Sequence, residues 1–436
     1  MPMPAPDVVS EALAELYERH RLLDEGTVAD YIPQLALADP DCFGLALVSM
    51  DGHRYQAGRC AEPFTLQSVS KPFVLALALA ELGPDEVGRS VGAEPSGEAF
   101  NAISLDPATG RPANAMINAG AIAVTSMIPG HSQASRFARI LDALGRFAGR
   151  PLDVDEDVYR SESESGDRNR ALAYLMRGAG VLPGDPTDAV QTYFRQCSVR
   201  ATVADLAVMA ATLGNGGVNP VTGAAVVPES VAVQVLAVMA TCGMYDAAGE
   251  WMLRVGLPAK SGVSGGLVAA SPARFGVAVH SPPLDAFGTP VRGTAVLREM
   301  SQRLGLHLML NPAPGAATVT LATASADGRV ALVAAQGALD FTAAERVLFA
   351  IRQQVPEALG WLVLDLERVT AMDATARAML EQTLMRLAAQ GHEVTVAGEA
   401  VADGGGPWHR VATRSEALAR AEAAAAAAAA GPRPVR

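Results

Sequence analysis

The sequence predicts an α+β protein of two domains, in which a larger domain of strands and helices precedes a smaller α/β domain. Its 436 residues exceed what one hydrophobic core normally organises. Half of them are apolar and 18% are charged, as in well-packed globular chains. The segment NPAPGAA separates two regions with different patterns of strands and helices. We therefore expect domains at 1–310 and 318–411, a linker at 311–317 and an alanine-rich tail at 412–436.

The larger domain is expected to begin with an amphipathic helix within residues 1–25, where apolar residues recur near helical spacing. The segment FGLALVSMDGHRYQAG then reads as two strands joined by an Asp-Gly turn. A buried helix follows in SKPFVLALALAELG and ends at Gly83 and Pro84. Residues 100–250 are mostly helical, whereas GGLVAASP and RFGVAVHSPP predict short strands.

The smaller domain shows strands that alternate with helices. VTLATASADGRVALVAAQG predicts a β-hairpin, and FTAAERVLFAIRQQVPEAL predicts a helix. A strand (GWLVLDL), a helix (DATARAMLEQTLMRLAAQG) and a last strand (HEVTVAG) follow. This β-β-α-β-α-β order is typical of a small separate α/β domain. Although alanine favours helix, we expect the alanine-rich tail after the smaller domain to be a low-complexity appendage.

Several function classes are disfavoured by composition. The net charge is −12 without a basic stripe, so neither nucleic acid nor an anionic membrane is an expected partner. The first residues lack a signal-peptide pattern, and no apolar run approaches the ~20 residues of a membrane span. The four cysteines form no CxxC pair and the histidines lie singly, so we expect a cytoplasmic protein without disulfides or a metal site.

Lysine is rare in this chain: of the 34 lysine and arginine residues, only Lys71 and Lys260 are lysines. Where arginine has replaced lysine so widely, a retained lysine suggests a need for an amine whose pKa can shift. Lys71 lies three residues after Ser68 at the start of the predicted buried helix, so the two side chains share one face. A buried lysine in this position can deprotonate the serine hydroxyl. Alone, the motif also fits a helix-capping serine beside a solvated lysine.

Lys260 belongs to a second motif, PAKSGVSGG, at the edge of a predicted strand. An SxxK motif on a helix and a Lys-[Ser/Thr]-Gly motif on a strand form the paired signature of serine β-lactamases and penicillin-binding proteins. Both lysines of the chain fall in this pair. The larger domain is therefore expected to have that fold: an antiparallel sheet flanked by helices, with a helical subdomain.

The substrate is indicated by a resemblance to one family. The motifs that carry it are VADYIPQLA (28–36), LQSVSKP (66–72), NAGAIAV (118–124), SESESGDRNRALAYLM (161–176), CGMYDAAGE (242–250) and AKSGVSGG (259–266). Together, and in this order, they closely resemble the glutaminase family of serine-dependent amidohydrolases over residues 28–310. The resemblance implies hydrolysis of L-glutamine to L-glutamate and ammonia, with no metal or organic cofactor.

The resemblance also implies roles for single residues. Ser68 matches the nucleophile, Lys71 its proton acceptor, and Tyr245 and Tyr193 the residues that assist proton transfer. The positions that match the glutamine pocket are Tyr31, Gln67, Ser68, Asn118, Glu162, Asn169, Tyr193, Tyr245 and Val263. Glu162 would bind the α-ammonium, and the backbone N–H groups of Ser68 and Val263 would stabilise the oxyanion. Lys260 would support the site electrostatically.

Other interpretations of these residues stay open from the sequence. Tyr31 also fits an ordinary half-buried tyrosine, and Asn118 a left-handed turn residue. Glu162 and Asn169 also fit helix caps, and the choice of Glu162 within ESESGDRN depends on its offset to Asn169 in the family. His53 and His280 are expected to be ordinary surface or core residues.

The smaller domain resembles a STAS domain of the anti-sigma-factor-antagonist type, through its element order and the segment LVLDLERVTAMDATARAML. In that family the helix after an Asp-Ser-Ser-like turn begins at a phosphorylated serine. Here the turn is Asp373-Ala374-Thr375, and alanine has no hydroxyl. A protein-docking or sensing role is therefore expected, with small-ligand binding as the second choice. Thr375 fits a helix N-terminal residue better than a modification site.

Two rival functions remain from the sequence. The larger domain could be another serine acyl-transfer enzyme of the same fold, such as a β-lactamase or a peptidoglycan peptidase, although no export signal is visible. The chain could instead be a non-enzymatic partner-switching protein. The intact set of Ser68, Lys71, Tyr245 and Lys260 argues against that reading. Family members commonly self-associate, so the resemblance also implies a homodimer or homotetramer.

Overall fold

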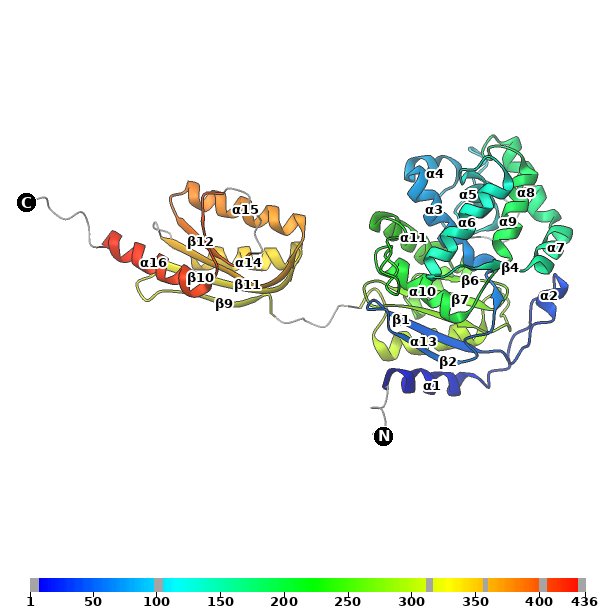
Figure 1. Ribbon diagram of the computed structural model, residues 1–436, viewed down its shortest axis with the longest axis horizontal. Coiled ribbons are helices and arrows are strands. Elements are labelled where there is room, and N and C mark those ends of the chain that lie inside the picture. The colour runs from blue at the N-terminus through cyan, green and yellow to red at the C-terminus, as the bar shows by residue number, and fades with distance from the viewer. Residues whose placement is uncertain (1–7, 98–104, 311–316, 356–359, 400–405, 430–436) are drawn as a thin grey trace, which may run out of the picture. The chain divides into compact units, whose positions relative to one another are not determined.

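The computed structural model divides into two compact units, Met1–Leu310 and Asn311–Arg436 (Figure 1). The residues that it describes are 8–97, 105–310, 317–355, 360–399 and 406–429. Most of the predicted linker, the end of the helix predicted to include 356–359 and the last residues of the tail lie outside the described residues.

The N-terminal unit contains most of the helices. They are α1 (Val8–His20), α2 (Pro33–Ala36), α3 (Lys71–Leu82), α4 (Pro84–Ser90), α5 (Asn118–Met127), α6 (Gln133–Ala148), α7 (Glu156–Ser165), α8 (Asp167–Gly178), α9 (Pro186–Cys197), α10 (Val203–Gly214), α11 (Glu229–Cys242), α12 (Ala248–Arg254) and α13 (Val291–Leu304). Its 3₁₀ turns are η1 (Gln67–Ser70) and η2 (Tyr245–Ala247). Its strands are β1 (Gly44–Ser49), β2 (Arg54–Gly58), β3 (Phe64–Thr65), β4 (Asp153–Val154), β5 (Val199–Ala201), β6 (Ala259–Ser261), β7 (Gly266–Ser271) and β8 (Phe275–His280).

An antiparallel sheet in the order β2-β1-β8-β7-β6 forms the centre of this unit. Apolar side chains alternate between its two faces, as the period of two in a strand requires. Leu45 and Leu47 of β1 join the core formed with α1, α12 and α13, whereas Ala46 and Val48 join the core formed with α3, α6, α10 and α11. The predicted strands and the antiparallel sheet flanked by helices are confirmed.

The sheet packs closely against α10. A Cβ added at Gly276 of β8 would lie 2.1 Å from the backbone nitrogen of Ala211, so only glycine permits this approach. A smaller sheet, in the order β3-β5-β4, connects the central sheet to the helical layer. Its strand β3 leads directly into η1 and α3, which places the Ser68 turn at the junction of the two layers.

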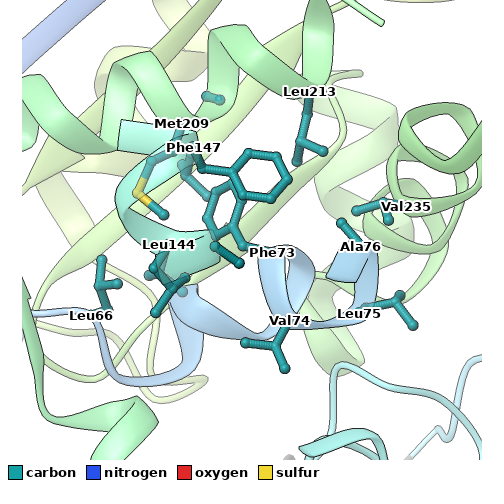
Figure 2. Close-up of a cluster of buried hydrophobic side chains, with 14 of the residues drawn as sticks. Leu66, Phe73, Val74, Leu75, Ala76, Leu144, Phe147, Met209, Leu213 and Val235 are labelled. Atoms are coloured by element: carbon teal, nitrogen blue, oxygen red, sulfur yellow. The ribbon is translucent and has the colours of Figure 1, made fainter. Parts of the chain in front are cut away.

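Helix α3 is buried over nearly its whole length, as its apolar sequence predicted. Figure 2 shows its side chains among those of α6, α10 and α11, with Phe73 against Phe147. The two phenyl rings lie 5.2 Å apart at 56°, a favourable tilted arrangement. A helix packed on all sides cannot shift easily, so the residue at its beginning, Lys71, has a fixed position.

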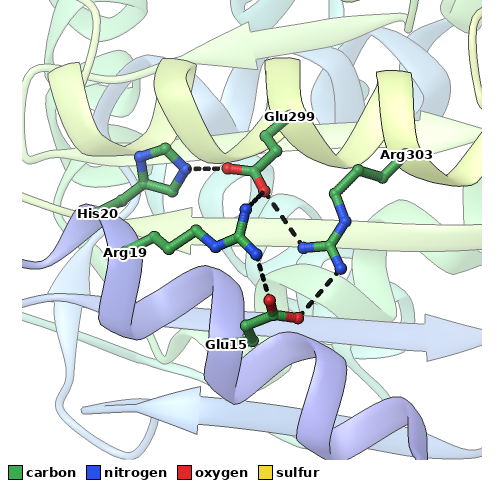
Figure 3. A network of polar contacts seen from close by, with 5 residues as sticks. All are labelled: Glu15, Arg19, His20, Glu299 and Arg303. Carbon is green, nitrogen blue, oxygen red and sulfur yellow. Dashed lines mark hydrogen bonds and ion pairs between the residues drawn. The ribbon is translucent and has the colours of Figure 1, made fainter.

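Helix α1 is held on α13 by a network of ion pairs (Figure 3). Arg19 Nη1 lies 2.7 Å and His20 Nε2 2.8 Å from the carboxylate of Glu299. Arg303 pairs with both Glu299 and Glu15, and Glu15 also pairs with Arg19. These partly exposed pairs contribute less than about 1 kcal/mol each, so the apolar face of α1 supplies most of its anchoring.

The C-terminal unit is a five-stranded sheet in the order β13-β12-β11-β10-β9, in which only β9 is antiparallel to its neighbour. Its elements are β9 (Val319–Ala324), β10 (Val330–Leu339), α14 (Phe341–Gln354), β11 (Trp361–Met372), α15 (Ala374–Ala389), β12 (Glu393–Ala397), β13 (His409–Val411) and α16 (Arg414–Ala429). Helices α14 and α15 cover one face, and α16 covers the other. The predicted hairpin and the alternation of helices and strands are confirmed.

The expectation of an alanine-rich appendage is wrong for the described part of that segment. Helix α16 packs on the sheet through Ala417, Ala421 and Ala425, which recur every four residues and are buried. Arg414 at its start also contacts the buried carboxylate of Asp365 on β11, with Nε 2.6 Å from Oδ2. Alanine supplies both helix propensity and a side chain small enough for a close helix-to-sheet contact. The segment therefore completes the second face of the domain.

No single helix of the described ranges is both long and apolar enough to cross a membrane. The pair Glu229–Cys242 and Tyr245–Arg254 reaches the required length and composition only together, with a bend of 90° between its halves. Both members contribute buried side chains to the cores of the N-terminal unit.

Candidate active site

The Ser68 turn is a short 3₁₀ helix that runs directly into α3. Residues three apart eclipse each other in a 3₁₀ turn, so Ser68 and Lys71 project from the same side. Both side chains are buried. Gln67, just before the serine, has a φ of +48°, a left-handed conformation that is unusual for a residue other than glycine. Such strain persists only where the surroundings fix the backbone.

A chain of buried polar groups fixes this turn. Ser70 Oγ donates to the carbonyl of Gln67 at 2.7 Å, and Gln196 Nε2 donates to Ser70 Oγ at 3.0 Å. Thr125 Oγ1 in turn donates to Gln196 Oε1 at 2.7 Å. Sequence reasoning assigned no role to these three residues. Ser70 lies inside the motif LQSVSKP, whereas Gln196 and Thr125 lie outside the motifs. They connect α5 and α9 to the turn that presents Ser68.

Lys71 is enclosed by acceptors from a distant segment. Its Nζ donates to the carbonyl of Met116 at 3.0 Å and to Asn118 Oδ1 at 2.7 Å. Burial lowers the pKa of Lys71 to about 7. A neutral amine has two N–H groups and one lone pair, and these two oxygens use both N–H groups. The lone pair is then left to accept a proton.

Tyr245 connects Ser68 to both lysines. It has a φ of +54°, so two of the three non-glycine residues with positive φ in the described ranges belong to this site. Burial raises the pKa of Tyr245, and a hydrogen bond with Ser68 opposes that rise. Lys71 Nζ lies 5.7 Å and Lys260 Nζ 3.8 Å from the centre of the Tyr245 ring.

Lys260 is fully buried behind Tyr245. Its Nζ donates to the carbonyl of Ser261 at 2.6 Å. Burial lowers the pKa of Lys260 strongly, and the nearby charge of Lys71 lowers it further. A positive charge on Lys71 therefore favours the neutral form of Lys260.

Asn118 is the centre of a second cluster. Its Oδ1 accepts from Tyr193 Oη at 3.2 Å as well as from Lys71, and its Nδ2 donates to Asn169 Oδ1 at 3.1 Å. Asn118 is the first residue of α5 and has no positive φ, so the left-handed-turn interpretation is wrong. Asn169 makes no cap hydrogen bond, since Gly166 occupies the N-cap of α8.

Glu162 and Tyr31 form a polar wall near Gln67. Tyr31 Oη donates to Glu162 Oε1 at 2.8 Å, and lies 3.5 Å from Gln67 Oε1. Burial raises the pKa of Glu162, and the hydrogen bond from Tyr31 opposes this. Although 49% of Tyr31 is exposed, its hydroxyl is bonded to the buried Glu162, and burial raises the pKa of that hydroxyl. Glu162 therefore lies in the last part of α7 as a buried acceptor, which excludes the capping interpretation.

Gln67 contributes a free donor to this wall. Its amide lies close enough to Glu162 to lower the pKa of that carboxyl, but its Nε2 meets no acceptor in hydrogen-bonding geometry among the described residues. A buried N–H group without an acceptor is costly and is usually satisfied by a ligand or by water. The wall formed by Tyr31, Gln67 and Glu162 thus offers both a donor and an anionic acceptor.

The turn that contains Val263 packs against the Ser68 turn. A Cβ added at Gly262 would lie 2.8 Å from Val69 Cγ2 and 3.1 Å from the carbonyl of Leu66, so this contact requires glycine. The Val263 side chain packs on Ile32, Leu35 and Val158. Its side chain therefore faces an apolar cluster, and only its backbone is left for the polar side of the site.

Cys197 is a further residue of the site that the sequence did not single out. It lies one helical turn after Tyr193 on α9 and is hydrogen-bonded to the Tyr193 hydroxyl. Burial raises the pKa of Cys197 to about 12, so it stays a neutral thiol. The spacing of four residues from Tyr193 on a helix was the only available signal.

The predicted residues thus converge in the N-terminal unit through a continuous series of contacts. They provide a hydroxyl, an amine with a lowered pKa, a buried carboxylate and several amides. No group of three or more His, Cys, Asp or Glu residues in the described ranges is arranged to hold a metal ion. In the C-terminal unit, Asp373 caps α15 by accepting from Ala376 N at 2.6 Å, and Thr375 is exposed.

Comparison with known proteins agrees with this chemistry. A glutaminase family model matches residues 26–309, and a STAS domain model matches residues 322–400. The chain is 44% identical to a glutaminase of Corynebacterium efficiens over 394 residues, which cover 89% of this chain and 92% of that protein. It is 49% identical to a glutaminase of Nostoc sp. over 303 residues, which cover 70% of this chain and 91% of that protein.

Solved structures show the same similarity. Mglu in its glutamate form has a TM-score of 0.82 and 38% identity, covering 90% of this chain and 98% of that chain. The probable glutaminase ybaS has a TM-score of 0.69 and 38% identity, covering 71% of this chain and all of that chain. The similarity to Mglu therefore includes both units, whereas the similarity to ybaS corresponds in length to the N-terminal unit alone.

Proposed function

Because the chain belongs to the glutaminase family, we propose that it hydrolyses the side-chain amide of L-glutamine through an acyl-enzyme formed on Ser68. The observation that carries this mechanism is the environment of Lys71, a buried amine whose two N–H groups are already used by carbonyl oxygens. Relatives of 42–53% identity are glutaminases, which favours this activity over a β-lactamase, a peptidase or a non-enzymatic protein.

The polar wall and the Asn118 cluster are proposed to bind the free amino acid. The substrate carries an α-ammonium, an α-carboxylate and a side-chain amide. Glu162 can accept from the ammonium, which would compensate the burial that raises its own pKa. Gln67, Asn118, Asn169 and Tyr193 can supply the remaining donors and acceptors. The crystallisation of the similar protein Mglu in an L-glutamate binding form supports an amino-acid pocket of this kind.

In the proposed first step, Ser68 Oγ attacks the carboxamide carbon while its proton passes to the lone pair of Lys71. The carbonyl oxygen becomes an oxyanion, which the backbone N–H groups of Ser68 and Val263 would stabilise. The C–N bond then breaks and ammonia leaves with one added proton. Tyr245, which is hydrogen-bonded to Ser68, is suitably placed to relay that proton.

In the second step, water attacks the glutamyl ester, and L-glutamate leaves as Ser68 recovers its proton. Lys71, Tyr193 and Tyr245 are all candidates for the proton transfers of the two steps. Lys71 and Tyr193 share the acceptor Asn118 Oδ1, so a proton on one alters the hydrogen bonding of the other.

The direct test of this function measures ammonia and L-glutamate separately after L-glutamine is added to the full-length protein. We expect the two products in equal amounts, and no turnover of the β-lactam nitrocefin. Nitrocefin hydrolysis without glutamine hydrolysis would favour the β-lactamase alternative. Failure to turn over either compound, with L-glutamine still bound, would favour a binding protein.

The pKa of Lys71 predicts the pH dependence of the reaction. Only the deprotonated amine accepts the Ser68 proton, and burial places this pKa at about 7. We expect kcat/KM for L-glutamine to rise about tenfold per pH unit on the acid side of pH 7 and to level off above it. Thermal unfolding measured at the same pH values separates this titration from acid unfolding. A flat profile between pH 5.5 and 8.5, relative to that pKa of about 7, would contradict Lys71 as the base.

We propose that the C-terminal STAS domain has a regulatory or docking role, with small-ligand binding as the alternative. It has its own apolar core, and its α15 turn has Ala374 where a phosphorylated serine stands in the family that the sequence resembles. This supports a docking function that does not depend on phosphorylation at that position.

Deleting residues 316–436 is expected to leave a soluble N-terminal unit that hydrolyses L-glutamine within about two-fold of the full-length kcat, because each unit has its own core. The Nostoc glutaminase supports this expectation, since 303 matched residues account for 91% of its length. Size-exclusion chromatography and the product assay would check it. Complete insolubility of the shortened chain would contradict the boundary.

We also propose that the protein acts in the cytoplasm as a homo-oligomer. Its four cysteines are free and buried, which suits a reducing compartment.

A further inference from the structure

We propose that His280 is a positioning residue that holds together the two backbone segments carrying the oxyanion donors, those of Ser68 and Val263. The inference depends on the proposed acyl-enzyme mechanism and extends it to a residue in the sheet. His280 makes its contacts with Ser264, Cys42 and Phe64 rather than with Ser68 or Lys71, and its sequence surroundings suggested only an ordinary core or surface residue.

His280 contacts both segments with different parts of one ring. Its Nε2 lies 3.0 Å from the carbonyl oxygen of Ser264, the residue that directly follows Val263. Its ring stacks on Phe64, with centroids 4.1 Å apart and planes only 6° from parallel. Phe64 begins β3, which leads within four residues to Ser68. One imidazole thus spans the gap between the two turns.

The tautomer follows from the partners. Burial lowers the pKa of His280 to about 4, so the ring is neutral at pH 7 and carries one N–H. A carbonyl oxygen only accepts, so that N–H must be on Nε2 and must donate to Ser264. Nδ1 is then an acceptor, and it faces the Cys42 thiol at 3.5 Å. The donor that holds the Val263 turn is therefore present at neutral pH.

The ring itself is held firmly by the sheet. His280 is the last residue of β8 and pairs with Gly44 on one side and Gly266 on the other. Ser281, the next residue, donates its backbone N–H to the carbonyl of Gly265 at 2.9 Å. Gly265 has a φ of +94°, and a Cβ there would lie 2.6 Å from Pro282, so the Val263 turn fits closely against the end of β8.

This arrangement matters for the rate because an N–H donor stabilises the oxyanion only within a narrow range of donor-to-oxygen distances. Loss of one such donor typically lowers kcat about 10²–10³-fold. Removal of a brace that displaces a donor without deleting it should have a smaller effect, about 10–100-fold, and should act on the transition state rather than on substrate binding. The polar contacts of His280 are with Ser264 and Cys42 rather than with Glu162 or Asn118 of the proposed glutamine pocket, so KM should change little.

The experiment compares His280→Phe, His280→Gln and the surface control His53→Phe in the full-length protein. His280→Phe keeps a ring to stack on Phe64 but has no donor for Ser264. We expect its kcat to fall about 10–100-fold, with KM and the Kd for L-glutamate within about two-fold of wild type. In His280→Gln the side-chain Nε2 can replace the imidazole donor but the stack on Phe64 is lost, so we expect a kcat between those of His280→Phe and the wild type. His53→Phe should be unchanged.

Two outcomes would overturn the proposal. One is a wild-type kcat in His280→Phe. The other is a rise in KM and in the Kd for L-glutamate that accounts for the whole loss of activity. If His280→Phe does not fold, Phe64→Leu decides, because it removes the stack and keeps the hydrogen bond. A lower kcat at constant KM supports the brace, and a wild-type kcat contradicts it. Activity in Ser68→Ala would instead show that the acyl-enzyme mechanism itself fails, independently of His280.

Discussion

Replacing Ser68 with alanine is expected to lower the release of ammonia from L-glutamine by about 10⁴-fold or more, because the acyl group then has no attachment point. The substitution removes one oxygen atom from a buried turn whose conformation is fixed by Ser70 and Gln196. We therefore expect the turn to keep its shape. The loss should appear in kcat, while L-glutamate still binds with near wild-type affinity.

Ammonia and L-glutamate production would be measured with calorimetric binding of L-glutamate on the same preparation. Ser90→Ala, at the end of α4 and outside the site, is the matched control and should retain full activity. Residual turnover within about tenfold of wild type in Ser68→Ala would mean that water attacks the amide directly, and the covalent mechanism would be abandoned.

Replacing Lys71 with arginine is expected to lower kcat by about 10³-fold or more, although the charge is formally conserved. A guanidinium keeps its proton at any pH at which the protein is folded, so it cannot accept the proton of Ser68. It is also larger and planar, whereas Lys71 Nζ is enclosed by the acceptor oxygens of Met116 and Asn118 and by the ring of Tyr245. A charge that cannot be released in this buried position should also destabilise the fold.

Lys71→Met separates the two effects, because it keeps much of the volume and removes the charge. We expect Lys71→Met to unfold at a temperature near that of wild type and to be as inactive as Lys71→Arg. Thermal unfolding and kcat measured for both variants provide the comparison. Wild-type-like turnover in Lys71→Arg would exclude a proton-accepting role for this residue.

Much of the fold was predictable from short-range patterns. The short apolar runs of β1, β7 and β8, which turn residues bound, and the apolar run of α3, which ends at Gly83 and Pro84, each indicate a structure locally. For the described part of residues 412–436, the prediction was wrong for a physical reason: alanine has no strong hydrophobic signal. Whether an alanine helix packs or is solvated depends on a partner surface, here the face of the sheet that α14 and α15 leave open.

Part of the candidate site could also be predicted from the sequence, and part of it could not. The spacing of Ser68 and Lys71, the rarity of lysine and the second motif at Lys260 are all present in the sequence. The resemblance to a family supplied the proposed pocket residues, but it assigned no role to Ser70, Gln196 or Cys197. The interpretations of Asn118 and Glu162 as turn or cap residues could be rejected only when their partners were known.

The sequence by itself determined that a serine and a lysine lie one turn apart at the start of a helix, and that the chain is a strand-and-helix protein of two parts. Only the tertiary structure decided that burial lowers the pKa of this lysine to about 7. Its pKa depends on the loss of water around it and on oxygens that lie 45 and 47 residues further along the chain. Desolvation and contacts of that range are properties of the packed molecule, because no local spacing of residues encodes which distant atoms will surround an amine.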